Sequence, residues 1–268
     1  MNDYMAEGKG PMLLHDHRGD FVPDGARADR WLYVVAGVLV VSGLFHLGVF
    51  AVDDRPWYGP LSWRKPATFG LSFGVTLATI AWVTTYLRMT ARTRTVLMAI
   101  FAVDCVVEVA GITLQAWRDQ PSHLNTSTPV DAAVAYTLAV GGAVLVAVLG
   151  TFAVVAVRGR VQGPPSTVLA VRAGFALLLA WLASGVAMIA VGTAAMRTGT
   201  PEHAYDVTGF LKAFHGVTLH GVLVLPALAW LLGRRTDDET RRYRIVLAAV
   251  VAYVAAALAV LVVNLAQT

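Results

Sequence analysis

The sequence has few charged residues and no long polar interval. Asp, Glu, Lys and Arg make up only 14% of its 268 residues, whereas 57% of them are hydrophobic. The mean hydropathy of +0.62 lies far above that of soluble globular proteins. A water-soluble core and a separate soluble catalytic domain are therefore both excluded, and the composition predicts an integral membrane protein.

Cysteines and continuous basic runs are also scarce. The single cysteine, Cys105, lies within an apolar segment and has no second cysteine with which to form an internal disulfide. The formal net charge of +4 comes from basic residues in short loops. That distribution is typical of membrane topology and excludes nucleic acid as a partner. The last apolar segment, 245–266, contains no lysine, which excludes a retinal Schiff base there.

Seven apolar segments are long enough to cross a bilayer as helices. The predicted fold class is therefore all-α, a polytopic membrane protein with a bundle of seven transmembrane helices over residues 31–268. A polar cytoplasmic tail, residues 1–30, precedes the bundle. The predicted spans are 31–51, 66–87, 95–117, 129–157, 168–194, 207–232 and 245–266.

The loops between these segments differ in their content of lysine and arginine. Most of the basic residues lie in the tail and in the loops that follow the second, fourth and sixth segments. Because basic loops remain in the cytoplasm, we expect a cytoplasmic N-terminus and an extracytoplasmic C-terminus. We also expect the protein to be a multi-pass component of the plasma membrane.

A polar stripe interrupts the third apolar segment. Polar or small residues recur there at steps of four, three, four and three: Asp104, Glu108, Gly111, Gln115 and Arg118. This spacing places them on one face of a helix. A charge exposed to hydrocarbon costs about 3 kcal/mol or more, so the stripe must face protein, water or a ligand. It is either a structural seam between helices or one wall of a site.

Other polar residues fall at matching depths in the predicted topology. They lie in the middle or the outer half of their segments, or at the outer mouth of the second one: His46, His215, His220, Arg64 and Lys65. The cytoplasmic half has almost nothing comparable. We therefore expect a polar site that opens to the outside and closes near the bilayer centre. This asymmetry argues against a simple pore, which needs a polar path throughout.

The favoured functional interpretation is a metal-dependent membrane enzyme that acts on a lipid-like substrate. Its divalent metal ion would be bound by His46, His215 and Glu108, since imidazole and carboxylate groups suit such ions. The metal would activate a water molecule, while Asp104 and Glu108 would move protons as catalytic groups. Three cations would hold an anionic headgroup, namely Arg64, Lys65 and Arg118.

A short motif adds to this interpretation. The Ser42-x3-His46 spacing and the late histidines resemble the seven-helix zinc hydrolases of the alkaline ceramidase and adiponectin-receptor superfamily. That family has a His-x3-His pair in its final helix, whereas this chain has His-x4-His, formed by His215 and His220 in the sixth segment. The resemblance covers these residues alone and implies that such a set can host a metal hydrolase.

Two other interpretations remain open. In the first, the chain binds haem for redox chemistry, with two of His46, His215 and His220 as axial ligands and Arg64, Lys65 or Arg118 at the propionates. In the second, it is a transporter, receptor or membrane-complex subunit, in which Asp104 and Glu108 bind an ion or a proton near the midplane. Membrane lipid is the expected partner in every case, and the sequence leaves the oligomeric state open.

Overall fold

The computed structural model describes residues 29–59, 61–199, 203–204 and 207–267. Within these residues, seven helices are long and apolar enough to cross a membrane. They are α2 (Arg30–Val52), α3 (Arg64–Val83), α4 (Ala91–Trp117), α5 (Pro129–Arg158), α6 (Pro165–Thr198), α8 (Lys212–Gly233) and α9 (Glu239–Ala266). The predicted all-helical bundle is thus confirmed, whereas nearly all of the predicted tail, 1–30, lies outside the described residues.

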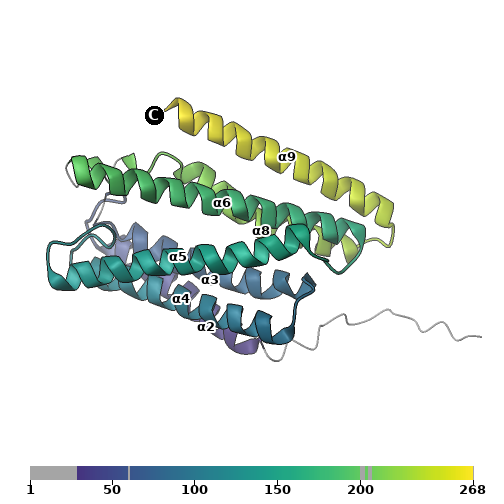
Figure 1. Ribbon diagram of the computed structural model, residues 1–268, viewed down its shortest axis with the longest axis horizontal. Helices are drawn as coiled ribbons and strands as arrows, with labels where there is room; N and C mark the ends of the chain where they lie inside the picture. Colours follow the sequence, from purple (N-terminus) through teal and green to yellow (C-terminus); the bar gives the residue numbers. More distant parts are fainter. Residues whose placement is uncertain (1–28, 60, 200–202, 205–206, 268) are drawn as a thin grey trace, which may run out of the picture.

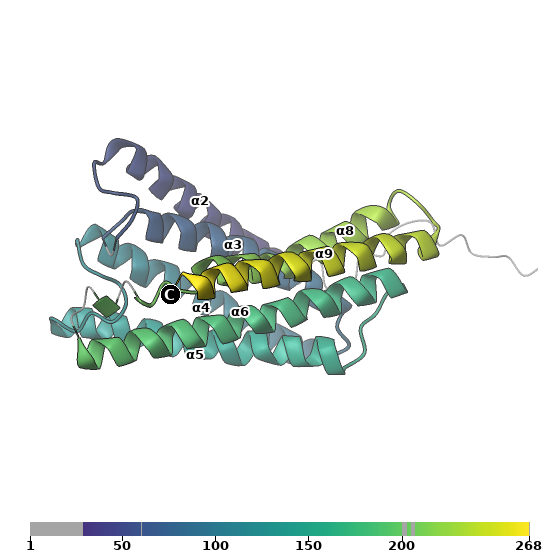
Figure 2. The ribbon, with the colours of Figure 1, turned by 90° about the horizontal axis from the view of Figure 1, so that it is seen from above.

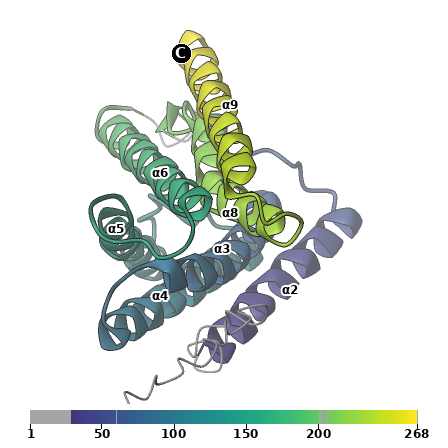
Figure 3. The same cartoon turned by 90° about the vertical axis from the view of Figure 1, so that its right-hand side faces the viewer.

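Successive helices run in opposite directions along the bundle (Figure 1). We call the end of the bundle where the C-terminus lies the C-terminal end. Four helices end there, namely α2, α4, α6 and α9. The other three begin there, namely α3, α5 and α8. Seen from above, α2 and α3 diverge from α5 and α6 toward this end (Figure 2). A view along the bundle places α2 and α9 at its periphery (Figure 3).

Local capping sets where several helices begin. Thr90 precedes α4, and its hydroxyl accepts a hydrogen bond from the Thr93 amide at 3.1 Å, so α4 starts at Ala91, earlier than predicted. Thr128 caps α5 by accepting from the Asp131 amide at 3.2 Å, so α5 starts at Pro129, where the predicted span 129–157 also starts. The predicted start of the sixth span, at 207, is too early for α8, because residues 208–211 form a turn before it.

Glycines allow α2 and α3 to approach backbone to backbone. A Cβ atom added at Gly70 would lie 2.7 Å from the Gly43 nitrogen, and one added at Gly43 would lie 2.6 Å from the Leu71 nitrogen. One turn further along α3, a Cβ at Gly74 would lie 2.6 Å from the Ala36 carbonyl oxygen. Small residues at such an interface replace hydrophobic burial with close van der Waals contact, which drives helix association in lipid.

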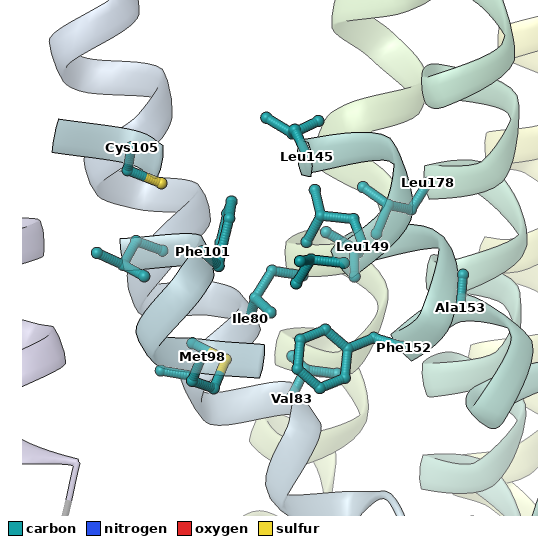
Figure 4. Close-up of a cluster of buried hydrophobic side chains, with 14 of the residues drawn as sticks. Ile80, Val83, Met98, Phe101, Cys105, Leu145, Leu149, Phe152, Ala153 and Leu178 are labelled. Atoms are coloured by element: carbon teal, nitrogen blue, oxygen red, sulfur yellow. The ribbon is translucent and has the colours of Figure 1, made fainter. Parts of the chain in front are cut away.

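The apolar core lies between α3, α4, α5 and α6 (Figure 4). Ile80, Phe101, Leu149 and Phe152 are all fully buried there. In contrast, α9 has only two buried residues, and most of its large apolar side chains are exposed, which would suit a helix that faces lipid.

An ion pair closes the end opposite the C-terminal end. The Arg94 guanidinium at the start of α4 donates to both carboxylate oxygens of Asp29, at 3.1 and 2.7 Å. It also donates to the Ala81 carbonyl at 2.6 Å, near the end of α3. Because both side chains are largely buried, this contact ties the entry to α2 and the adjoining ends of α3 and α4 together.

Candidate functional site

The polar stripe of α4 is its contact surface with α5. A Cβ atom added at Gly111 would lie 2.9 Å from Leu138 Cδ2. Residues on either side of Gly111 along the stripe also meet α5, so the five positions share one face, as their spacing predicts. The stripe is therefore the seam between two helices. Its two halves differ in whether the charged groups have partners.

The half of the stripe near the C-terminal end is fully paired through Asp131, a buried residue in the first turn of α5. One carboxylate oxygen accepts hydrogen bonds from Arg118 Nη1 at 2.8 Å and Gln115 Nε2 at 3.0 Å. The other accepts from the hydroxyls of Thr128 at 2.6 Å and Ser127 at 3.2 Å. We call this network the Asp131 latch.

The latch changes the interpretation of two residues. Asp131 stands three residues after the Thr128 cap, a position that the sequence explains by capping, and in the structure its carboxylate also joins the end of α4 to the start of α5. Arg118, predicted to hold a headgroup or a propionate, instead forms an ion pair with Asp131 and donates to Gln115 Oε1. The structure thus gives this part of the stripe a structural role.

The other half of the stripe holds Asp104 and Glu108, which are 6% and 4% exposed. Both carboxyl groups pack against the backbone of Gly141 on α5. A Cβ at Gly141 would lie 2.9 Å from Asp104 Oδ1 and closer still to Glu108 Oε1. Because both oxygens lie within 2.9 Å of one point, they are at most 5.8 Å apart. We call these two residues the carboxylate pair.

The carboxylate pair has no visible compensation for its charge. Among the described residues, none forms a hydrogen bond or an ion pair with either carboxylate, and Asp104 Oδ2 is buried without a partner. Two negative charges at this separation repel by about 3 kcal/mol at an effective dielectric constant of about 20. Each charge also costs several kcal/mol at mid-membrane. A proton or a cation on the pair would remove most of this cost.

His46 forms structural hydrogen bonds with both ring nitrogens near the C-terminal end. Its Nδ1 lies 2.7 Å from the Ser42 carbonyl, to which it donates, and its Nε2 accepts from the Trp117 indole at 3.1 Å. These two bonds fix the tautomer and occupy both ring nitrogens. The ring also stacks on Trp63, and the Arg55 guanidinium carbon lies 4.0 Å from the centroid of the Trp63 ring. His46 therefore joins α2 to α3 and α4.

The two late histidines lie in different surroundings. His215 joins α8 to α6: its Nδ1 is 2.9 Å from Ser184 Oγ and 3.1 Å from the Trp181 carbonyl, and its ring packs on the Trp181 ring. His220 is exposed, with Nδ1 2.6 Å from the Gly216 carbonyl one turn earlier. The spacing of five residues has placed the two rings on different faces, as expected for a helix.

The predicted metal ligands are not assembled. His46 lies at the contact of α2 with α3 and α4, His215 between α6 and α8, and Glu108 between α4 and α5. Within the described part of the chain, no three His, Cys, Asp or Glu side chains are grouped so that they could hold a metal ion. The structure therefore gives no support to metal binding, and it brings no two of the three histidines together as axial ligands for haem.

Arg64 and Lys65 lie at the start of α3. Arg64 donates to the Trp57 carbonyl at 3.2 Å, and Lys65 lines a cavity of about 10 Å³ together with Ser122. The neighbouring His123 packs near the Phe69 ring. Burial, and to a smaller extent the nearby charge of Lys65, lowers the pKa of His123 from 6.5 to about 4. His123 is therefore neutral at pH 7.

Sequence reasoning missed two residues of this region. His123 stands in the polar loop 118–128, next to Ser122, and this Ser-His pair was the signal that the sequence offered. In the structure, Ser122 Oγ and His123 Nδ1 lie 2.9 Å apart. Gly141 is the first of two adjacent glycines within an otherwise apolar segment. A glycine pair is common in membrane helices, so only the position of the neighbouring carboxylates distinguishes it.

Comparison of the chain with models of protein families, with curated proteins and with solved structures finds no match.

Proposed function

We propose that this chain is a multi-pass protein of the cell membrane that takes up and releases a proton at the carboxylate pair, as a transporter or as the proton-handling subunit of a membrane complex. The proposal follows one of the interpretations that the sequence leaves open. The observation that carries it is the packing of Asp104 and Glu108 together against Gly141, without a cationic partner among the described residues.

The depth of the carboxylate pair supports this proposal. Asp104 is the central residue of α4, and Gly141 lies near the middle of α5. Secondary transporters place their coupling ions near the bilayer midplane, where a carboxylate is costly and is kept only for a function. A purely structural carboxylate is expected to be paired, as Asp131 is in the same seam.

Binding of one proton stabilises the carboxylate pair relative to the state in which both groups are ionised. One proton on two neighbouring carboxyl groups removes their mutual repulsion and leaves a single negative charge to stabilise. Its release requires a change in surroundings, either entry of water or movement of α5 away from α4. Binding that depends on the conformation of the helices is the basis of ion coupling.

A metal-dependent enzyme acting on a lipid-like substrate is the weaker candidate. His46 would have to give up its hydrogen bond to Trp117, and His215 its contact with Ser184, before either nitrogen could bind a metal. Both histidines would then have to approach Glu108 from other helix interfaces. No described contact favours that rearrangement.

Infrared spectroscopy of the purified protein in lipid tests the proposal. A protonated carboxyl group gives a C=O stretching band that an ionised carboxylate lacks. We expect a band that disappears reversibly at high pH and that is lost in Glu108→Gln or Asp104→Asn. Asp131→Asn is the matched control and should leave the band in place. A spectrum in which none of the carboxyl bands depends on Asp104 or Glu108 would rule out the proton site. Loss of the band on addition of Na⁺ or K⁺ at constant pH would instead show that the pair binds a cation.

A further inference from the structure

The carboxylate pair is close to other polar groups in one direction along the α4–α5 seam. Toward the C-terminal end, the next polar side chain of the stripe is Gln115, seven residues after Glu108. This separation is about 10 Å along a helix at a rise of 1.5 Å per residue. Gly111 is the one position of the stripe between them. A single layer of the seam therefore separates the pair from the Asp131 latch.

In the opposite direction, the seam is apolar over a longer distance. Phe101 stands one turn before Asp104 on α4 and is fully buried. Leu145, Leu149 and Phe152 of α5 are buried in the same cluster, over about two turns of that helix (Figure 4). A proton that left the pair in this direction would have to pass several large side chains.

Leu138 of α5 fills the single layer on the C-terminal side. A Cβ atom added at Gly111 would lie 2.9 Å from Leu138 Cδ2 and 3.4 Å from Leu138 Cγ, so the leucine occupies the space that a side chain at 111 would need. Leu138 is only 2% exposed. It precedes Gly141 by three residues and follows Asp131 by seven, which places it between the pair and the latch on α5 as Gly111 is on α4.

This layer can open at little cost. A leucine side chain moves between staggered rotamers without breaking a hydrogen bond. When it leaves the space at Gly111, the glycine has no side chain with which to refill that space. Water that enters there would meet the polar groups of Gln115 and Asp131 on one side and Glu108 on the other. Apolar constrictions that exclude water when closed are an established type of gate.

We propose that Leu138 is the gate through which the carboxylate pair exchanges its proton with the C-terminal end of the bundle. In the closed state, Leu138 packs against Gly111 and keeps water from the pair. In the open state, a carboxyl group of the pair gives its proton to an entering water molecule, which leaves as hydronium, and the carboxylate regains a proton by the reverse step. The predicted orientation places this end outside the cell. The inference rests on the proposed function, because a gate is needed only if the pair exchanges a proton.

The rate at which the infrared band of the pair shifts after transfer into D₂O tests the gate. Leu138→Ala and Leu145→Ala remove the same atoms from two buried leucines of α5, on opposite sides of Gly141. We expect Leu138→Ala to exchange several-fold faster than the native protein. Leu145→Ala should retain the native rate, because it enlarges a largely apolar cavity of about 20 Å³ that Phe101 also lines, and apolar cavities stay dry.

The comparison separates a gate from a packing role. Both alanine variants should lose similar stability, read as Tm, so a leucine that only packs would accelerate exchange equally in the two. Equal rates in Leu138→Ala and Leu145→Ala would therefore overturn the proposal. Leu138→Met keeps the volume and should keep the slow exchange of the native protein.

Two further results keep the outcomes distinct. If Leu138→Ala fails to fold, Leu138→Val makes a smaller opening and should still accelerate exchange, whereas Leu145→Val should not. A native protein with no carboxyl band from the pair would refute the proton site itself. A band that is present, but whose exchange rate is the same with every residue at 138, would refute the gate alone.

Discussion

The two halves of the α4–α5 seam contrast sharply, although they belong to one stripe on one helix face. Near the C-terminal end, Asp131 accepts four side-chain hydrogen bonds, one of them from an arginine. At mid-helix, Asp104 and Glu108 pack against Gly141, and neither carboxylate has a hydrogen-bond or ion-pair partner among the described residues. Buried charge is thus compensated in one half and left uncompensated in the other, within about three helical turns.

This difference separates structure from function in a membrane interior. A compensated buried charge holds helices in register and needs no other explanation. An uncompensated one costs several kcal/mol in a membrane interior, which is why we propose an exchangeable proton as the partner of the carboxylate pair. The same residue types at the same spacing can therefore have a structural or a functional role. The hydrogen-bond donors and acceptors around them distinguish the two roles.

The largest expected effect comes from breaking the Asp131 latch. Asp131→Ala leaves the Arg118 guanidinium and the Gln115 amide without their buried acceptor. We expect a fall in Tm on the order of 10 °C, measured by thermal unfolding in lipid or detergent. Asp119→Ala is the matched control, because the Asp119 ion pair with Arg55 is exposed, and exposed pairs contribute little. Equal shifts in the two variants would remove the distinction between the halves of the seam.

The next effect tests how tightly α5 covers the carboxylate pair. A Cβ at Gly141 would collide with both carboxyl groups, whereas one at the adjacent Gly142 would meet nothing within 4 Å. Gly141→Ala should therefore destabilise the protein by about 1–3 kcal/mol. Gly142→Ala should be nearly neutral. Both are read from denaturant unfolding.

A double variant identifies the colliding group. Glu108→Ala removes the carboxylate nearest to the added methyl group, so Gly141→Ala should cost much less in that background. Strict additivity of the two substitutions would show that the Gly141 backbone does not contact Glu108.

The smallest effect concerns His123, in the loop that the Asp131 latch anchors. Its pKa of about 4 in the folded state lies below the ordinary value of 6.5, chiefly because of burial and then because of Lys65. The unfolded chain therefore binds more protons between these values, so stability is complete above about pH 6.5 and declines as the pH falls toward 4. His123→Gln should flatten this decline in Tm between pH 7 and pH 5. An unchanged slope would assign the decline to other groups.

Much of the fold follows from the sequence alone. Long apolar runs predict each helix, and the Thr128-Pro129 pair predicts the start of α5 correctly. The errors fall at helix ends. Arg64 and Lys65 extend α3 by two residues before Pro66, and the turn at 208–211 delays α8. These ends depend on caps and on interfacial packing, to which hydropathy is insensitive.

The candidate site was only partly predictable for a different reason. Periodicity identifies the face that Asp104, Glu108 and Gln115 share, but it does not identify the helix that covers this face. The partners of Gln115 and His46 come from Asp131 and Trp117, which lie 16 and 71 residues away in the sequence. Gly141 has no side chain to mark it, so its role emerges only from the position of the two carboxyl groups.

The proton on the carboxylate pair is the central claim, and hydrogen–deuterium exchange of its infrared band tests it most directly. If Asp104 and Glu108 hold an exchangeable proton, transfer of the native protein into D₂O should shift a carboxyl C=O band. That shifted band should be missing from Glu108→Gln and retained in Asp131→Asn. A native spectrum in which no carboxyl band responds to deuterium, or a response that survives in Glu108→Gln, would contradict the account.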